Sequence, residues 1–202
     1  GAMLLLKLAS LYYLVVALFA LKKPKPIPRA KPKTRFACVI AARNEERVIG
    51  ELVQSLLQQN YPKTLFDIYV MPNNCTDHTA LAAIRAGAGI LKPRGEVRCK
   101  GDALHEAFET LLRKDYDAFC VFDADNVVDA DFLSRMNDAF LAGARVTKGA
   151  MRVKNPQDGP LCGSYGLYFT CFDFFFSRAR MNCGLSSKLV GTGFAVHRSV
   201  LE

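Results

Sequence analysis

The sequence contains no tryptophan, only three histidines and no Cys-X-X-Cys pair among its seven cysteines. Without such pairs or a Cys/His metal spacing, a structural zinc domain is excluded. The odd cysteine count and the apolar surroundings of several cysteines indicate reduced, mostly buried thiols in a cytosolic domain. His78, His105 and His197 pair with no serine or cysteine nucleophile, so nothing resembles a hydrolase triad.

Acidic residues are absent from the first 44 positions, and this absence explains the formal charge of +8. Lys7 and seven cations between Lys22 and Arg35 carry the whole excess, whereas 19 cations and 19 acids balance from Phe36 onward. A domain with no net positive charge is not typical of nucleic-acid binding, so we expect no nucleic-acid partner. The 202 residues, half of them apolar, suffice for one domain with an appendage.

Residues 3–21 form an apolar run with a single charge, Lys7. As a helix this run would be about 28 Å long, close to the thickness of a bilayer core. Most cations follow the run instead of preceding it, which favours a transmembrane helix over a cleaved signal peptide. Cationic flanks of such helices lie on the cytoplasmic side, so we expect the linker and the domain there. A soluble core helix is the alternative. Residues 1–2, before Met3, have the look of a remnant of tag cleavage.

Residues 22–35 form a basic linker in which four prolines alternate with the cations. This composition predicts an extended, semi-rigid spacer that does not pack. Beside an anionic leaflet each cation would contribute on the order of 1 kcal/mol. A solvated linker without contact to membrane lipid is the alternative.

Residues 36–202 alternate between strand-like and helix-like patterns. Apolar runs predict strands at 36–41, 66–71, 90–91, 118–122 and 144–153, and helical spacing predicts helices at 45–59, 101–114 and 131–142. Residues 76–79 are predicted to cap a further helix that runs to about residue 86. This order indicates an α/β fold with a mostly parallel sheet covered by helices on both faces. In such sheets, ligands bind at the carboxyl ends of the strands.

Asp123 and Asp125 follow one predicted strand directly, at a spacing that points both carboxylates toward the same side. Paired carboxylates suit Mg²⁺ or Mn²⁺, which usually also bind substrate phosphates. Capping of the following turn is the alternative. Polar residues also follow the first two strands, and Arg94, Arg98 and Lys100 precede a helix start, where a diphosphate would bind.

In order and spacing, these pieces resemble the family 2 glycosyltransferases, which have the GT-A fold. The similarity runs from about residue 36 to 202 and is greatest to the membrane-anchored branch of cellulose-, chitin- and hyaluronan-synthase-like enzymes. The segments that carry it are 41–45 (Ala-Ala-Arg-Asn-Glu), 55–62, 74–80, 100–104, 123–125 (Asp-Ala-Asp) and 191–195 (Gly-Thr-Gly-Phe-Ala).

The resemblance implies a role for each matching position. The nucleotide pocket would be lined by Ala42, Arg43 and Glu45, with the base contacted by Asn73 and Asn74. The diphosphate would lie near Lys100 and Gly101, and the nucleotide or sugar near Asp123 and Ala124. The divalent metal would be held by Asp125 with Asp123. The acceptor side would be lined by Gly191, Thr192 and Gly193.

The family's reaction is displacement of a nucleoside diphosphate by an acceptor hydroxyl with inversion, and its usual donor is a UDP-sugar. The family often has aspartate at the position of Asn73, so the resemblance leaves the donor open. Its catalytic base lies beyond the Gly-Thr-Gly segment, where this chain has only Glu202. We therefore expect a chain truncated at its C-terminus, with the base beyond residue 202. The alternatives are a non-catalytic nucleotide-binding or assembly fragment and a nucleotidyltransferase, whose usual glycine-rich loop is absent from 41–45.

Residues 165–176 contain seven aromatic side chains. They are too many for one helix face. A core helix is one interpretation. The other is a helix that contacts the membrane surface or a second subunit of a homo-oligomer.

Overall fold

The computed structural model describes residues 1–202, which divide into two compact units. One unit combines residues 1–26 with residues 150–189, and the other combines residues 27–149 with residues 190–202. The second unit contains the sheet and all the residues for which the resemblance implies a role.

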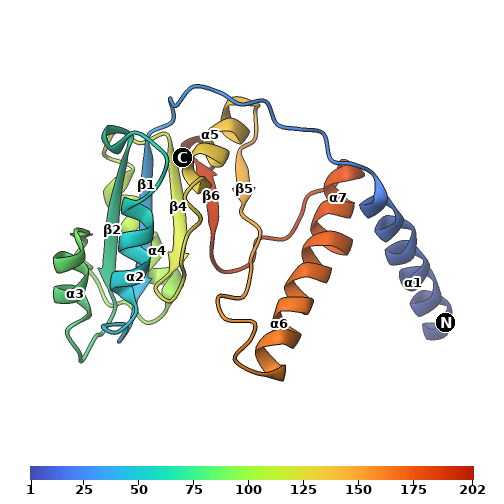
Figure 1. Cartoon of the computed structure of the whole chain (residues 1–202), viewed down its shortest axis with the longest axis horizontal. Coiled ribbons are helices and arrows are strands. Elements are labelled where there is room, and N and C mark those ends of the chain that lie inside the picture. Colours follow the sequence, from blue (N-terminus) through green and yellow to red (C-terminus); the bar gives the residue numbers. More distant parts are fainter. The chain divides into compact units, whose positions relative to one another are not determined.

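The sheet has six strands in the order β3-β2-β1-β4-β6-β5 (Figure 1). Its strands are β1 (Phe36–Ala42), β2 (Phe66–Pro72), β3 (Gly89–Ile90), β4 (Ala118–Asp123), β5 (Val146–Lys148) and β6 (Phe194–His197). Strands β1 to β4 are parallel, and β6 runs antiparallel to both β4 and β5. The predicted mostly parallel α/β sheet is confirmed.

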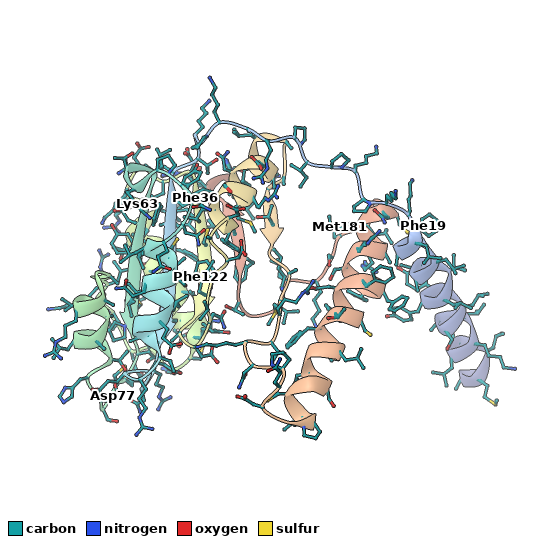
Figure 2. All side chains as sticks on the ribbon, in the orientation of Figure 1. Phe19, Phe36, Lys63, Asp77, Phe122 and Met181 are labelled. Carbon is teal, nitrogen blue, oxygen red and sulfur yellow. The ribbon has the colours of Figure 1, made fainter.

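Helices cover both faces of the sheet because the side chains of β1 alternate between two cores. Phe36, Cys38 and Ile40 pack in a cluster with α2 (Ile49–Leu57), α3 (Thr79–Ala86) and α5 (Phe132–Leu141). Ala37 and Val39 pack on the other side with α4 (Lys100–Leu111). Figure 2 labels Phe36 and Phe122, two aromatic members of the first cluster.

The bounds of several predicted elements differ from the structure. Helix α2 begins at Ile49 and not at 45, because the N–H groups of Glu45 and Glu46 donate to the side chains of Thr79 and Asp77, at and just before the start of α3. Helix α3 begins at Thr79 with His78 as its N-cap, within the segment 76–79 that was predicted to cap it. The strand predicted over 144–153 is only β5, three residues long, and β6 was not predicted at all.

The second half of the basic linker packs against α5. The N–H of Ala30 donates to the Asp138 carboxylate at 2.9 Å, and the N–H groups of Lys33 and Thr34 both donate to Asn137 Oδ1 at 3.1 Å. The Tyr61 hydroxyl donates to the Thr34 carbonyl, and burial raises the pKa of Tyr61 to about 12. The expectation of a spacer that does not pack is therefore wrong for residues 30–34.

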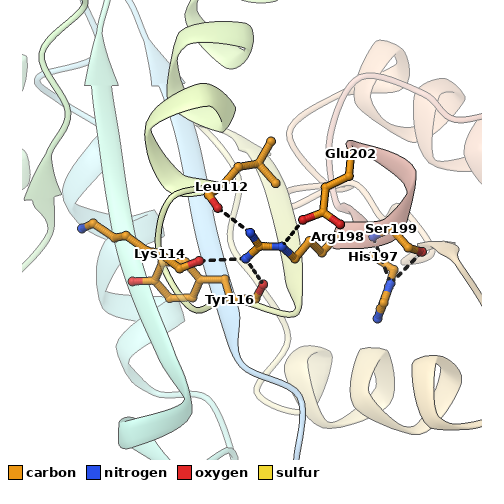
Figure 3. Close-up of polar contacts among 7 residues, drawn as sticks. All are labelled: Leu112, Lys114, Tyr116, His197, Arg198, Ser199 and Glu202. Carbon is orange, nitrogen blue, oxygen red and sulfur yellow. Dashed lines mark hydrogen bonds and ion pairs between the residues drawn. The ribbon is translucent and has the colours of Figure 1, made fainter.

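Arg198, at the start of the 3₁₀ helix η4 (Arg198–Val200), fastens the last strand to the end of α4 (Figure 3). Its guanidinium donates to the carbonyls of Leu112 at 2.5 Å and Lys114 at 2.8 Å, and it pairs with Glu202. Carbonyls at a helix C-terminus have no partner within the helix, so the arginine satisfies groups that α4 leaves open.

The other unit is helical. It contains α1 (Ala2–Leu18) with the 3₁₀ turn η1 (Phe19–Leu21), and the chain α6 (Pro160–Cys171), π-helix η3 (Phe172–Arg178) and α7 (Ala179–Asn182). The run Ala2–Leu21 is long and apolar enough to cross a membrane, and nearly all of its side chains are exposed. No residue of α6 is buried, which does not support a core helix for the aromatic stretch.

Candidate functional site

The carboxyl ends of β1, β2 and β4 meet at one edge of the sheet. Ala41 lies in register with Met71 on one side and with Asp123 on the other. Figure 2 shows Asp77 at this edge and Lys63, which precedes β2, at the opposite edge. The parallel pairing therefore gathers the polar segments that follow these strands, as the sequence predicted.

A cleft of about 220 Å³ opens at this edge. Its lining comes from the end of β1 and the next loop, from the residue after β2, and from the start of α4: Ala41, Ala42, Arg43, Glu45, Asn73, Arg98, Cys99 and Lys100. Five of the predicted site residues share this cleft, namely Ala42, Arg43, Glu45, Asn73 and Lys100. Ala41 and Cys99 line it without having been predicted as site residues.

Asn73 lines this cleft, and its side chain carries an unsatisfied acceptor. The residue is 5% exposed, and its side-chain oxygen Oδ1 is buried without a hydrogen-bond partner. The backbone holds the residue in place, because its N–H donates to the Ala42 carbonyl at 2.8 Å. A buried amide oxygen without a donor costs free energy, so the site is suited to a ligand N–H, such as that of a nucleobase.

The start of α4 presents positive charge to the cleft. Lys100 is the first residue of the helix, and its Nζ contacts Asp123 Oδ1 and donates to the Gly191 carbonyl at 2.7 Å. Asp102 shapes the preceding loop by accepting the N–H of Arg98 at 2.9 Å, and this hydrogen bond lowers the pKa of Asp102. A helix N-terminus flanked by Arg98 and Lys100 favours a diphosphate.

Four carboxylates share this edge of the sheet. Burial raises the pKa of Glu45, and the charges of Asp125, Asp77 and Asp123 raise it further. Asp77 is held ionised, because the Thr79 hydroxyl donates to it and lowers its pKa. Like charges this close to one another repel, and a bound cation would relieve that repulsion.

No group of three or more His, Cys, Asp and Glu side chains comes together to hold a metal ion. Asp123 is already paired with Lys100, and the Asp125 carboxylate contacts only the Asn126 amide, at 3.1 Å. Two carboxylate residues nevertheless fit a divalent cation of the magnesium type, which takes its remaining ligands from water and phosphate. Asp125, with Asp123, would hold the ion.

The Gly191-Thr192-Gly193 segment braces the Asp-Ala-Asp turn. Thr192 Oγ1 accepts the N–H of Asp123 at 2.8 Å and donates to Asn126 Oδ1 at 2.5 Å. Gly193 N–H donates to the Val121 carbonyl at 2.8 Å. This bracing was not predicted, since no local pattern ties Thr192 to residues almost 70 positions earlier.

Three other predicted residues lie outside the lining of the cleft. Asn74, in the left-handed region with φ of 47°, donates from its amide to the Val97 carbonyl at 2.8 Å and so pins the loop before α4. Ala124 is buried in the core cluster. Gly101 lies in the first turn of α4. Their contact with a substrate stays a prediction.

The sequence model of the family described as "Glycosyltransferase like family 2" matches residues 32–202. The chain is 29% identical over 191 residues to the "Probable glycosyltransferase YdaM" of Bacillus subtilis, covering 89% of this chain and 44% of the relative. It is also 29% identical over 190 residues to a "Beta-monoglucosyldiacylglycerol synthase" of Synechocystis, covering 85% and 36%. The chain thus spans less than half the length of these curated relatives.

Solved structures share the fold. A mannosyltransferase from Pyrobaculum calidifontis, in complex with GDP-Man and Mn²⁺, superposes with a TM-score of 0.59 at 23% identity, covering 73% of this chain and 44% of that one. Residues 1–349 of S. aureus TarS superpose with a TM-score of 0.62 at 17% identity, covering 83% and 48%. The chain therefore belongs to glycosyltransferase family 2, and its sheet has the GT-A arrangement.

Proposed function

We propose that the sheet-bearing unit binds a nucleotide-diphospho sugar, with UDP as the nucleotide, and transfers the sugar to an acceptor hydroxyl with inversion. The observation that carries this proposal is the composition of one cleft. It combines the unpaired Asn73 oxygen, suited to a base, with Arg98 and Lys100 at a helix N-terminus, suited to a diphosphate. Glycosyltransferase neighbours solved with UDP or GDP-Man support the same ligand class.

In the proposed reaction the acceptor oxygen bonds to the anomeric carbon while the bond from that carbon to the diphosphate oxygen breaks. Lys100 would stabilise the charge that develops on the leaving diphosphate. A divalent metal, Mg²⁺ or Mn²⁺, would act as a Lewis acid on the same diphosphate. Thr192 keeps the turn that carries Asp123 in one conformation. The acceptor hydroxyl gives up its proton, and we assign none of this chain's acids as the base that takes it.

A nucleotidyltransferase is disfavoured, because the glycosyltransferase family matches residues 32–202. Binding without turnover is the other alternative, and it is separated from transfer by measuring hydrolysis of the sugar nucleotide as well as its binding.

We also propose that Ala2–Leu21 spans a membrane and that the transferase faces the cytoplasm. Twenty residues in helical form are about 30 Å long, and Lys22, Lys23 and Lys25 follow directly. The Synechocystis relative is named as a glycolipid synthase, which supports a membrane lipid as the acceptor. Membership of the cellulose-, chitin- and hyaluronan-synthase-like branch stays a prediction.

Calorimetric titration of UDP in the presence of Mn²⁺ tests the proposed donor site. We expect binding that is weakened at least tenfold by removal of the metal with EDTA, and an Asp125→Asn variant that no longer responds to the metal. Asp115→Asn is the matched control, since Asp115 is an exposed surface carboxylate. If Asp125→Asn binds UDP with unchanged metal dependence, the metal site is wrong. If no nucleotide binds at all, the donor site is wrong.

A further inference from the structure

The segment Pro160–Asn182, which we call the aromatic segment, exposes large apolar side chains. Leu161 is 72% exposed, Tyr168 58% and Phe175 52%, and no residue of α6 is buried. Ring contacts run along the segment, with Phe172 stacked between Tyr168 and Phe176 at centroid distances of 6.1 and 4.9 Å. Exposed apolar side chains gathered on one segment in this way indicate a surface that contacts a membrane or another protein.

The serine and threonine hydroxyls of α6 need no water. Ser164 Oγ donates to the Pro160 carbonyl at 2.8 Å, and Thr170 Oγ1 donates to the Gly166 carbonyl at 2.9 Å. The sequence carries no charge from residue 159 to 172. The next acid, Asp173, is paired with Arg152 at 3.2 Å. A helix can lie among acyl chains only when its polar groups form hydrogen bonds within the protein.

The far end of the aromatic segment is fastened to the end of α1 that carries the cations. Ala179 packs with Val16 and Ala20. Asn182 Nδ2 donates to the carbonyls of Phe19 at 2.9 Å and Lys22 at 2.8 Å, which closes the C-terminus of the apolar run. Figure 2 shows Phe19 and Met181 where these two helices meet. The depth of α1 in a bilayer would therefore fix the depth of the aromatic segment.

We propose that the aromatic segment is embedded in the boundary between headgroups and acyl chains of an anionic lipid leaflet, on the side where Lys22 leaves the membrane. The 14 uncharged residues make a helix of about 21 Å, too short to cross a bilayer but sufficient to lie within one leaflet. Tyrosine side chains are enriched at this depth. Arg178 and Arg180 stand over the rings of Phe174 and Phe176, and Arg178 also donates to the Lys22 carbonyl at 3.1 Å, so it lies at the end of α1 where the cations follow. Cations at this level favour an anionic leaflet.

This inference rests on the proposed membrane span of α1 and is independent of the transferase reaction. It goes beyond anchoring by one helix, because it makes residues 150–189 a second element in contact with lipid. The chain would then contact lipid through two elements, whereas a single spanning helix would contact lipid only along its own surface.

The absence of tryptophan permits a direct test with the full chain in vesicles of phosphatidylcholine and phosphatidylglycerol. The variants Tyr168→Trp, Leu11→Trp and Ile84→Trp each introduce the sole indole, and bromines are placed on the lipid chains near the headgroup or near the bilayer centre. We expect Tyr168→Trp to have blue-shifted emission and to be quenched at least twofold more by the shallow bromines. Leu11→Trp should be quenched most by the deep bromines. Ile84→Trp, on an exposed position of α3, should not be quenched.

The outcomes distinguish a failure of this inference from a failure of the proposed membrane span of α1. Quenching of Leu11→Trp without quenching of Tyr168→Trp overturns the inference alone. Absence of quenching in both overturns the membrane span as well. Blue-shifted but unquenched emission from Tyr168→Trp shows that protein covers the segment, as in a homo-oligomer, and also overturns it. Phe175→Trp repeats the test if Tyr168→Trp fails to fold, and UDP titration of the same samples reports on the donor site separately.

Discussion

The brace between Thr192 and the Asp-Ala-Asp turn gives the sharpest prediction about the site. A Thr192→Val substitution keeps the shape of the side chain but removes its hydroxyl. The change deletes the acceptor of the Asp123 N–H at 2.8 Å and the donor to Asn126 Oδ1. Thr192 is buried, so water does not replace these partners freely.

The magnitude follows from the two lost hydrogen bonds. Each contributes about 0.5–1.5 kcal/mol net, and a buried group left unpaired costs about 1–3 kcal/mol. We expect Thr192→Val to lower the free energy of unfolding by about 2 kcal/mol. The turn that carries both predicted metal ligands also loses its fixed geometry. We therefore expect Mn²⁺-dependent UDP binding to weaken about tenfold, which corresponds to about 1.4 kcal/mol.

Urea unfolding followed by circular dichroism measures the first effect, and calorimetric UDP titration measures the second. Thr192→Ser is the matched control, because it retains the hydroxyl, and it should bind UDP within about threefold of the parent chain. Equal binding by Thr192→Val and the parent chain would refute the role of the brace. A loss in the serine variant that the valine variant does not share would show that packing of the methyl group, and not the hydroxyl, holds the turn.

Three further predictions concern stability, measured by urea unfolding. Asn137→Ala removes the acceptor of the Lys33 and Thr34 N–H groups and should destabilise the fold by about 2 kcal/mol; a loss below about 0.5 kcal/mol would contradict the packing of the linker. Arg198→Met should cost about 2–3 kcal/mol by freeing the carbonyls at the end of α4, whereas Glu202→Gln should cost less than 1 kcal/mol. The pKa of Asp102 is lower in the folded chain than its value of 3.8 in the unfolded chain. The ionised carboxylate therefore stabilises the fold above pH 3.8, and this stabilisation is lost as the pH falls through the folded pKa. Asp102→Asn should make the free energy of unfolding less dependent on pH in acid, and an unchanged dependence would contradict this.

The sequence predicted most of the sheet because its central strands are short apolar runs. Residues 36–41 and 118–122 are buried almost throughout, and most of residues 66–71 are buried, so their hydrophobicity alone marks them. Strand β6 escaped prediction because four residues that pair antiparallel at the side of β4 carry too little pattern. The start of α2 was misplaced because Glu45 and Glu46 bind Thr79 and Asp77, contacts between loops that no local propensity reports.

The candidate site was predictable as a set of segments, but the part each residue plays was not. Strand ends in a parallel sheet meet at one edge, so the positions of Glu45, Asn73 and Asp123 followed from the topology. The pairing of Lys100 with Asp123 depends on how α4 lies along the sheet, which the sequence does not determine. The buried, unpaired oxygen of Asn73 is likewise a property of the packed loops alone.

One segment near the end of the chain sets the position of α4 relative to the site. The Gly191 carbonyl accepts from Lys100 at the first residue of the helix, and Arg198 holds the carbonyls of Leu112 and Lys114 just beyond its last residue. Strand β6, between these two contacts, is paired with β4, which ends in Asp123. Helix α4 is thus clamped at both ends by residues 191–198, and its N-terminus is aimed at the cleft. Lys100 contacts Gly191, just before β6, and Asp123 ends the strand with which β6 pairs. We therefore expect Arg198→Met to weaken diphosphate binding at the opposite end of the 12-residue helix.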